Sequence, residues 1–148
     1  MSMGKPLPHD AAPLHVTGQA RYIDDLSFPA NALHLAFGLS TVAHGEITGL
    51  DLSAVRAAPG VVAVLSAEDL PDMPDCSPSM HDEPLLAMGT VHYVGQPVFL
   101  VIADSHLAAR KAARLGKITC RELPALLTVD AAPAASRRSV PTGSRPSR

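Results

Sequence analysis

Histidines are the side chains of this sequence best suited to proton transfer or metal binding near neutral pH. There are seven of them: His9, His15, His34, His44, His81, His92 and His106. No two show the HExxH or i,i+4 helical spacing that brings two imidazoles onto one zinc ion. His44 stands in an Ala-His-Gly stretch, where we expect a structural bond to a backbone carbonyl at a turn. For His92 we expect a cross-strand or surface position.

Two acidic groups are the other candidates for acid–base or cation chemistry. Asp24 and Asp25 are neighbours at the end of a predicted strand, so their side chains would point to opposite faces. They are therefore poor candidates for a shared acid–base site, and a turn-capping role is favoured. The run His81-Asp82-Glu83 could bind a cation, but a solvated loop is the favoured interpretation.

The motifs of common covalent and nucleotide-binding catalysts are missing from the sequence. Neither G-x-S-x-G nor G-x-G-x-x-G occurs. The two cysteines, Cys76 and Cys120, cannot by themselves hold an iron–sulfur cluster, which takes four ligands. We expect Cys120 to be a small buried residue of a strand and Cys76 to be exposed in a loop. The residues therefore predict no catalytic, cofactor-binding or metal-binding side chain.

Composition and charge limit the class of protein. The 148 residues suffice for one domain with a core, and 47% of them are hydrophobic, which does not fit a disordered chain. Aromatic residues make up only 3%, so base stacking is a poor route to nucleic acid. Residues 131–148 carry four arginines and no acid, which leaves a formal charge of −6 on the rest. We expect no nucleic-acid partner, no membrane span and a cytoplasmic location.

The run from Val91 to Ala103 is the most informative stretch for the fold. Two β-rich apolar segments meet at Gly95-Gln96-Pro97. Glycine allows the φ values of a kink, and proline fixes φ and removes a donor, so the backbone should bend here. Residues 98–103 lack polar alternation, which is typical of a strand covered on both faces. Asp104-Ser105 then offers an N-cap for a helix.

Apolar patterns and chain breakers predict the remaining elements. We predict strands at 20–25, 33–39, 45–51, 61–65 and 117–123, and short helices at 52–58 and 106–115. Pro59-Gly60 should end the first helix, Ser66 with Asp69 should cap one helical turn, and residues 71–90 should form a long loop. The second helix should bury a narrow face made of Leu107, Ala108, Ala112 and Leu115. The last strand, helix and strand predict a βαβ unit or its antiparallel variant.

These features together resemble the N-terminal α/β-hammerhead domain of the molybdenum-binding subunit of xanthine dehydrogenases and aldehyde oxidases. The similarity runs from about Pro8 to about Asp130, and its details are most similar to the bacterial xanthine dehydrogenase large subunit. Its blocks are HVTGQARYIDDL at 15–26, the stretch 33–71, and the stretch 81–115 that contains the Gly-Gln-Pro corner. The structural motif positions are Gly18, Ala20, Tyr22, Asp24, Asp25, His44, Pro59, Gly60, Gly95, Gln96 and Pro97.

The resemblance implies an α+β fold, the α/β-hammerhead, with a small mixed sheet and two or three short helices. The domain would span residues 15–130. An extended arm at 1–14 would precede it, and a disordered basic tail at 131–148, which departs from the family pattern, would follow it.

The resemblance also implies a scaffold and interaction role in a molybdenum hydroxylase that oxidises purines and passes electrons to iron–sulfur centres and FAD. The family's molybdenum–pterin and catalytic residues lie in later domains, so this chain is expected to bind no cofactor, to be truncated and to be inactive alone. Its expected partners are those missing molybdenum-cofactor domains and the iron–sulfur/FAD subunit, with self-association through an uncovered apolar face. Two alternatives remain: an independent small binding module that shares the fold, or a fragment of a related aldehyde- or carbon-monoxide-oxidising enzyme.

Overall fold

The structure is a computed structural model that describes residues 4, 6–72, 74–78 and 82–132. Internal contacts divide the chain into two units, residues 1–32 and residues 33–148, and each is described by itself. The run His81-Asp82-Glu83, for which a solvated loop was favoured over a cation site, begins at His81, which lies outside the described residues. Residues 133–148, most of the predicted basic tail, also lie outside them.

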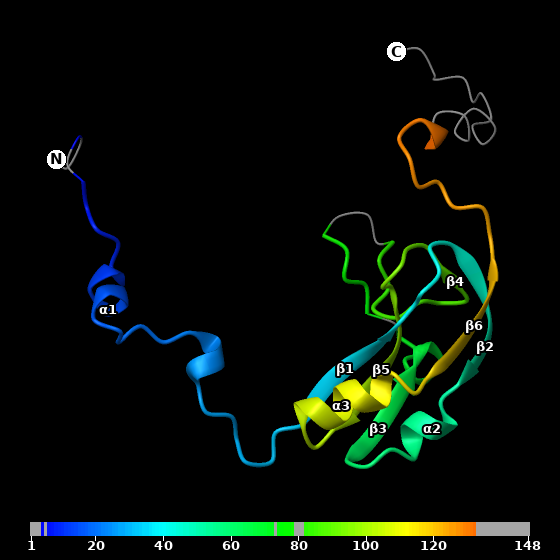
Figure 1. Ribbon diagram of the computed structural model, residues 1–148, viewed down its shortest axis with the longest axis horizontal. Coiled ribbons are helices and arrows are strands. Elements are labelled where there is room, and N and C mark those ends of the chain that lie inside the picture. Colours follow the sequence, from blue (N-terminus) through cyan, green and yellow to red (C-terminus); the bar gives the residue numbers. More distant parts are fainter. Residues whose placement is uncertain (1–3, 5, 73, 79–81, 133–148) are drawn as a thin grey trace. The chain divides into compact units, whose positions relative to one another are not determined.

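The N-terminal unit contains helix α1 (Ala12–Val16) and the 3-10 turn η1 (Ile23–Asp25) (Figure 1). Both correct the sequence-based prediction, which expected an extended arm up to residue 14 and a strand at 20–25. Pro13 stands in the first turn of α1, where a fixed φ favours the helix and a missing N–H costs no bond. At η1, the Asp25 carboxylate accepts a hydrogen bond from the Tyr22 N–H at 2.9 Å. Such local side-chain bonds compete with strand pairing.

The second unit holds the strands. In chain order the described elements are β1 (His34–Leu39), β2 (Gly45–Asp51), α2 (Ser53–Arg56), β3 (Val61–Ser66), η2 (Ala67–Asp69), β4 (Thr90–Val91), β5 (Pro97–Ala103), α3 (His106–Ala113) and β6 (Lys117–Glu122). The predicted strands at 33–39, 45–51, 61–65 and 117–123 are confirmed within one residue, and both predicted helices within two. The predicted turn after β3 is also present, because the Asp69 carboxylate accepts bonds from the Ser66 N–H at 2.7 Å and hydroxyl at 2.8 Å.

The strands form two antiparallel sheets. Sheet A has the order β1-β5-β3, and sheet B has the order β4-β2-β6. The α+β hammerhead fold is confirmed, with two antiparallel sheets where one small mixed sheet was expected. Because β5 and β6 lie in different sheets, β5-α3-β6 is neither a βαβ unit nor its antiparallel variant. A strand's hydrophobic pattern specifies which face is buried, but it does not specify the neighbouring strand.

Phe99 of β5 is the largest fully buried side chain, and the core around it is shared by both sheets and α3. Its ring packs against the Cα atoms of Gly38 in β1 and Gly116 before β6, where a Cβ would overlap the ring. Ile47 and Ile118 pack against the same core from sheet B. Phe99 therefore packs between β1 and the residue that leads into β6, within the core that both sheets share.

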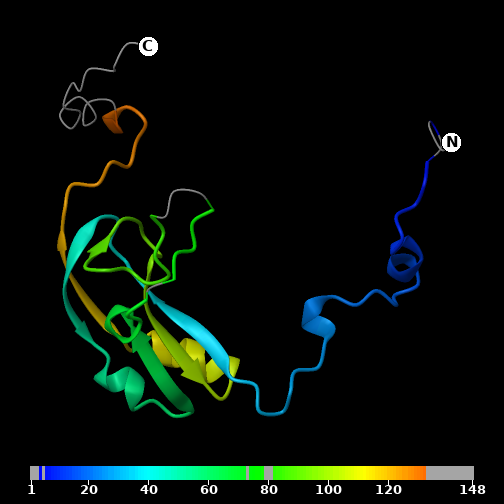
Figure 2. The ribbon, with the colours of Figure 1, turned by 180° about the vertical axis from the view of Figure 1, so that it is seen from behind.

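Helix α3 packs on sheet A through small side chains. Ala109 and Ala112 are buried, whereas Leu107 and Leu115 are 62% and 46% exposed. The predicted buried face was therefore wrong at both leucines. Close approach to β1 and β5 leaves room for alanine but not for leucine on the buried side. The helix lies in front of these two strands in Figure 1 and behind them in Figure 2.

Candidate functional site

The N-terminal motif folds into a local turn. The Tyr22 hydroxyl lies 3.2 Å from His15 Nδ1, and the Asp25 carboxylate caps η1. The predicted capping role is thus confirmed for Asp25, while Asp24 is exposed beside it and Ala20 is partly buried. No described side chain of this unit is buried, and Tyr22 itself is 64% exposed. The motif builds a turn and leaves its apolar side chains in solvent.

His44 and His92 lie together at the end of sheet B. His44 Nδ1 is 3.0 Å from the Pro124 carbonyl oxygen, which is the backbone bond expected for this residue. The His92 ring stacks on the His44 ring with centroids 5.8 Å apart. The His44 bond joins the chain beyond β6 to the loop before β2, so His44 has the structural role expected of it, and His92 is exposed beside it.

The Gly95-Gln96-Pro97 stretch forms the predicted corner. Gly95 has φ +88°, which only glycine adopts readily, and its N–H donates to the Ser40 carbonyl at 2.8 Å. The Ser40 N–H donates in turn to the Gln96 carbonyl at 2.9 Å. Gln96 is buried, and its Oε1 accepts from the His92 N–H at 2.6 Å. The corner therefore joins the end of β1 to the start of β5.

Pro59 and Gly60, the chain break predicted after α2, lie against the start of α3. Gly60 has φ +80°, and its carbonyl accepts from the Asp104 N–H at 2.9 Å. A Cβ at Gly60 would stand 2.5 Å from Asp104 Oδ1, the end of an exposed side chain that can move aside, so the positive φ is what favours glycine here. Ser105 is the predicted N-cap, and its hydroxyl accepts from a backbone N–H of the first turn of α3 at 3.3 Å. Gly18, in the other unit, also has positive φ, at +71°.

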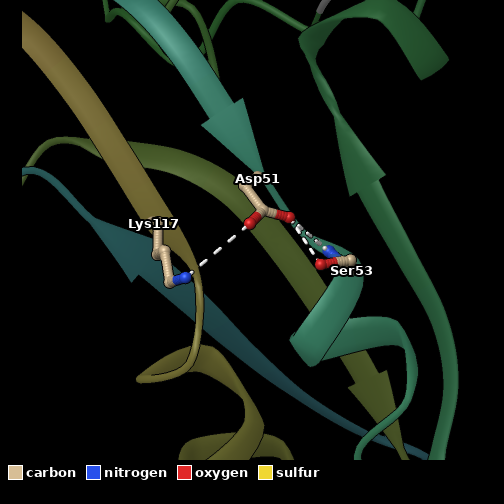
Figure 3. Close-up of polar contacts among 3 residues, drawn as sticks. All are labelled: Asp51, Ser53 and Lys117. Carbon is tan, nitrogen blue, oxygen red and sulfur yellow. Dashed lines mark hydrogen bonds and ion pairs between the residues drawn. The ribbon is translucent and has the colours of Figure 1, made fainter.

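Asp51 marks the junction between β2 and α2 (Figure 3). Its Oδ1 accepts from the Ser53 hydroxyl at 2.6 Å and from the Ser53 N–H at 3.0 Å. Lys117 Nζ of β6 lies 3.9 Å from the other carboxylate oxygen. The Ser53 hydroxyl bond first, then the Ser53 N–H and the Lys117 charge, hold the pKa of Asp51 below its ordinary value. These contacts position the start of α2 and favour the ionised form of the Asp51 carboxylate.

Metal-binding side chains do not cluster in the described part of the chain. No group of three or more His, Cys, Asp or Glu residues there lies close enough to hold one ion. Cys76 is exposed, as expected, whereas Cys120, which was expected to be buried, is only partly buried; both are free thiols. No helix among the same residues combines the length and the apolar character needed to cross a bilayer.

The most distinctive surface is the face of sheet A opposite α3, here called the outer face: Leu35 and Phe37 of β1, Ala63 and Leu65 of β3, and Ile102 of β5. Cross-strand register places Leu35 beside Ile102 and Ala63 beside Ile102, so these side chains share one face. Leu35 is 56% exposed and Phe37 is 41% exposed, and the other three are partly buried. In Figure 2 this side of β1 and β5 faces the viewer, with α3 behind.

The sequence predicted an uncovered apolar face but did not identify its residues, although a signal for them exists. Along β1, the large residues Leu35 and Phe37 alternate with the small residues Ala36 and Gly38. Because alternate residues of a strand point to opposite faces, small residues on one side indicate a closely packed helix. Large apolar residues on the other side then indicate a second packing surface.

The two sheets and the helix that packs on sheet A through alanines define a small α+β domain. The outer face of sheet A is an exposed apolar surface. Residues 17–124 match the family described as the aldehyde oxidase and xanthine dehydrogenase a/b hammerhead domain, and the chain belongs to this family. It is 40% identical over 131 residues to xanthine dehydrogenase of Oryza sativa subsp. japonica and 40% identical over 131 residues to aldehyde oxidase 1 of Rattus norvegicus. Each alignment covers 88% of this chain and 10% of the relative.

Solved structures carry the same fold. Quinoline 2-oxidoreductase from Pseudomonas putida 86 superposes with a TM-score of 0.75 at 31% identity, over 89% of this chain and 18% of that one. The chain therefore spans about a tenth of the length of the curated relatives it matches. The family's enzymes are molybdenum hydroxylases built from several domains or subunits, and the matched segment is one of those domains.

The described residues do not fit a molybdenum–pterin group. A pterin needs several buried donors and acceptors that converge on one pocket. The buried polar side chains here are Ser40 and Gln96, and both already bind local backbone. The Ser40 hydroxyl donates to the Val42 carbonyl at 3.0 Å and accepts from the Val42 N–H at 3.1 Å. No step of cofactor chemistry can be assigned to these side chains.

Proposed function

We propose that this chain is the N-terminal scaffold and interaction domain of a molybdenum-binding subunit of the xanthine dehydrogenase type. The outer face of sheet A carries this proposal. Leu35, Phe37 and Ile102 form an apolar surface that a solvated module would cover or replace with polar residues. In the proposed role, this face packs against the cofactor-carrying part of the enzyme.

The N-terminal unit supports the same role independently. Its apolar side chains are exposed, including Ile23 at 77% and Phe28 at 65%. A segment with no buried side chain of its own gains order chiefly by packing on a partner. We propose that the segment 1–32 acts as a strap on a neighbouring domain or subunit.

We further propose that the chain alone oxidises neither purines nor aldehydes and acts in the cytoplasm. The match to the hammerhead segment, about a tenth of the relatives' length, supports the first point. The two free thiols fit a reducing compartment. Metal analysis and a dye-linked xanthine assay on the purified chain test the claim of inactivity. Stoichiometric molybdenum with xanthine turnover would contradict it.

A chimera tests the scaffold role directly. Residues 17–124 would replace the corresponding hammerhead segment of the rice xanthine dehydrogenase, to which the chain is 40% identical. We expect the chimera to retain molybdenum and to oxidise xanthine. The same chimera carrying Leu35→Lys and Phe37→Lys should lose assembly and molybdenum, whereas Thr48→Lys on sheet B should behave like the parent. Equal activity of all three would refute the role of the outer face.

The alternative is a scaffold for an aldehyde-oxidising member of the same family. The identity to the rat aldehyde oxidase equals that to the rice xanthine dehydrogenase, so the identities do not distinguish the two enzyme classes. A parallel chimera in the rat enzyme separates the alternatives. Assembly in the rat enzyme with failure in the rice enzyme would favour the aldehyde-oxidising class.

A further inference from the structure

β1 is an open edge of sheet A. It pairs with β5 on one side, and the sheet order β1-β5-β3 leaves its other side without a strand. Among the described residues, no backbone hydrogen bond joins residues 35–39 to anything but β5. Because backbone groups of a strand point alternately to its two sides, part of this strand's N–H and C=O groups face outward. Such an edge can pair with an extended chain.

The β1 edge lacks the residues that usually keep an edge strand from pairing with another chain. The sequence of β1, HLAFGL, contains no lysine, acid or proline. The register shift in its pairing lies at Gly38/Leu39, near the end of the strand, and leaves the first residues regular. By contrast, the edge strand β6 of sheet B carries Lys117, Arg121 and Glu122. Charged edges resist strand addition, so β1 is the more accessible of the two.

Positive charge lies beside this open edge. A surface hollow of about 420 Å³ lies between β1 and α3, and its lining includes Phe37, Leu39, Thr41, Arg110 and Arg114. Both arginines are exposed and come from the last turns of α3 and its C-cap. Within the described part of the chain, neither guanidinium has an ion-pair partner. A strand added at β1 would therefore run past two guanidinium groups.

We propose that the β1 edge binds an extended acidic segment of another polypeptide by strand addition. The backbone of that segment would pair with residues 35–39, and its carboxylates would pair with Arg110 and Arg114. Because alternate residues of a strand point to opposite faces, its apolar side chains would lie on the other side, beside Leu35 and Phe37 of the outer face. Charge complementarity argues against β1 of a second copy as the occupant, because β1 carries no acid to meet the arginines. This inference goes beyond the scaffold role, since it concerns the strand edge and requires no molybdenum domain.

The test uses the full 148-residue chain and a synthetic blocked peptide of alternating valine and glutamate, titrated by NMR. We expect shifts centred on the β1 amides and on Arg110 and Arg114. The double variant Arg110→Gln, Arg114→Gln should weaken binding about tenfold, the effect of losing about 1.4 kcal/mol. The control is Lys111→Gln, which removes one positive charge from a part of α3 that does not line this hollow, and it should change affinity less than about twofold.

Two modified peptides separate strand addition from simple charge attraction. N-methylation at alternate residues blocks one set of backbone donors, so one of the two methylated isomers should fail to bind while the other binds. Replacing glutamate by glutamine should weaken binding as much as the arginine double variant does. Equal binding of both methylated isomers, equal loss in the Lys111 variant, or shifts away from β1 would each overturn the proposal. Failure here with a working rice chimera would leave the scaffold role standing.

Discussion

The outward faces of the two sheets of this domain differ in the polarity of their side chains. Sheet B pairs charged residues across its strands: Glu46 of β2 forms an ion pair with Arg121 of β6, and Asp51 lies 3.9 Å from Lys117. On the outer face of sheet A the paired residues are apolar instead, with Leu35 opposite Ile102. Both sheets bury their inner faces in one core. The same chain therefore has one sheet adapted to water and one sheet with a large apolar outward face.

This difference separates a self-sufficient module from a packing domain. An independent binding module would show polar outward faces on both sheets, as sheet B does. The apolar face of sheet A is the feature expected of a domain that contacts a larger protein. The hammerhead match, which covers a small part of much longer relatives, agrees with that distinction.

The largest expected effect is a loss of stability from a substitution in the core that the two sheets share. Phe99→Ala should lower the free energy of unfolding by about 3–5 kcal/mol, because it leaves a cavity against Gly38 and Gly116. Phe37→Ala, the same change at a side chain that is 41% exposed, should cost less than about 1 kcal/mol. Urea denaturation of both variants measures the contrast. Equal losses would mean that Phe37 is as well packed as Phe99.

The second effect concerns association rather than stability. Leu35→Lys with Phe37→Lys should reduce self-association and hydrophobic-dye binding, because it places charge on the outer face of sheet A. Sedimentation velocity and dye fluorescence measure both properties. Thr48→Lys on sheet B is the control and should leave both unchanged. If the sheet B variant changed association as much, the two faces would not differ in the way described.

A smaller effect is expected from the charge pairs of sheet B. A double-mutant cycle on Glu46→Ala and Arg121→Ala should give a coupling of about 0.2–1 kcal/mol, because both side chains are substantially exposed. The coupling should shrink in high salt. A coupling of several kcal/mol would show that this pair is a stability determinant and not a solvated surface contact.

The smallest effect is a pH dependence. Hydrogen bonds from Ser53 and Ser66 hold the pKa values of Asp51 and Asp69 below the ordinary 3.8. A lowered folded-state pKa gives stability that is present above about pH 4 and is lost as the pH falls through the folded-state value. Ser53→Ala should therefore reduce the fall in urea midpoint between neutral and acidic pH. An unchanged pH profile in that variant would contradict the assignment of Ser53.

The sequence was sufficient to predict the elements of the second unit. Apolar runs and breakers such as Pro59-Gly60 specify these strands locally, and the structure agrees within two residues, except before the Gly95 corner, where the expected buried strand is limited to Thr90–Val91 and Tyr93 and Val94 are exposed. The partner of each strand was not predictable, because pairing of β6 with β2 depends on packing between distant segments. The exposure of Leu107 was not predictable from local sequence either, because the orientation of α3 depends on how closely the helix approaches the sheet.

The N-terminal unit was predicted less well, because short polar bonds decide its shape. Tyr22 and Ile23 have high strand propensity, yet the Asp25 carboxylate captures a nearby N–H and forms a turn. For the candidate site, His44 and the corner at Gly95 were predictable from local signals. The outer face required the register of three strands, which no single stretch of sequence contains.

Hydroxyl-radical footprinting of Leu35 and Phe37 tests the role of the outer face most directly. The isolated chain and the rice chimera would be labelled side by side, with sheet B residues as the internal reference. We predict strong labelling of both side chains in the isolated chain and protection in the chimera, with sheet B unchanged. Equal labelling of Leu35 and Phe37 in the two proteins would contradict packing of this face against the rest of the enzyme.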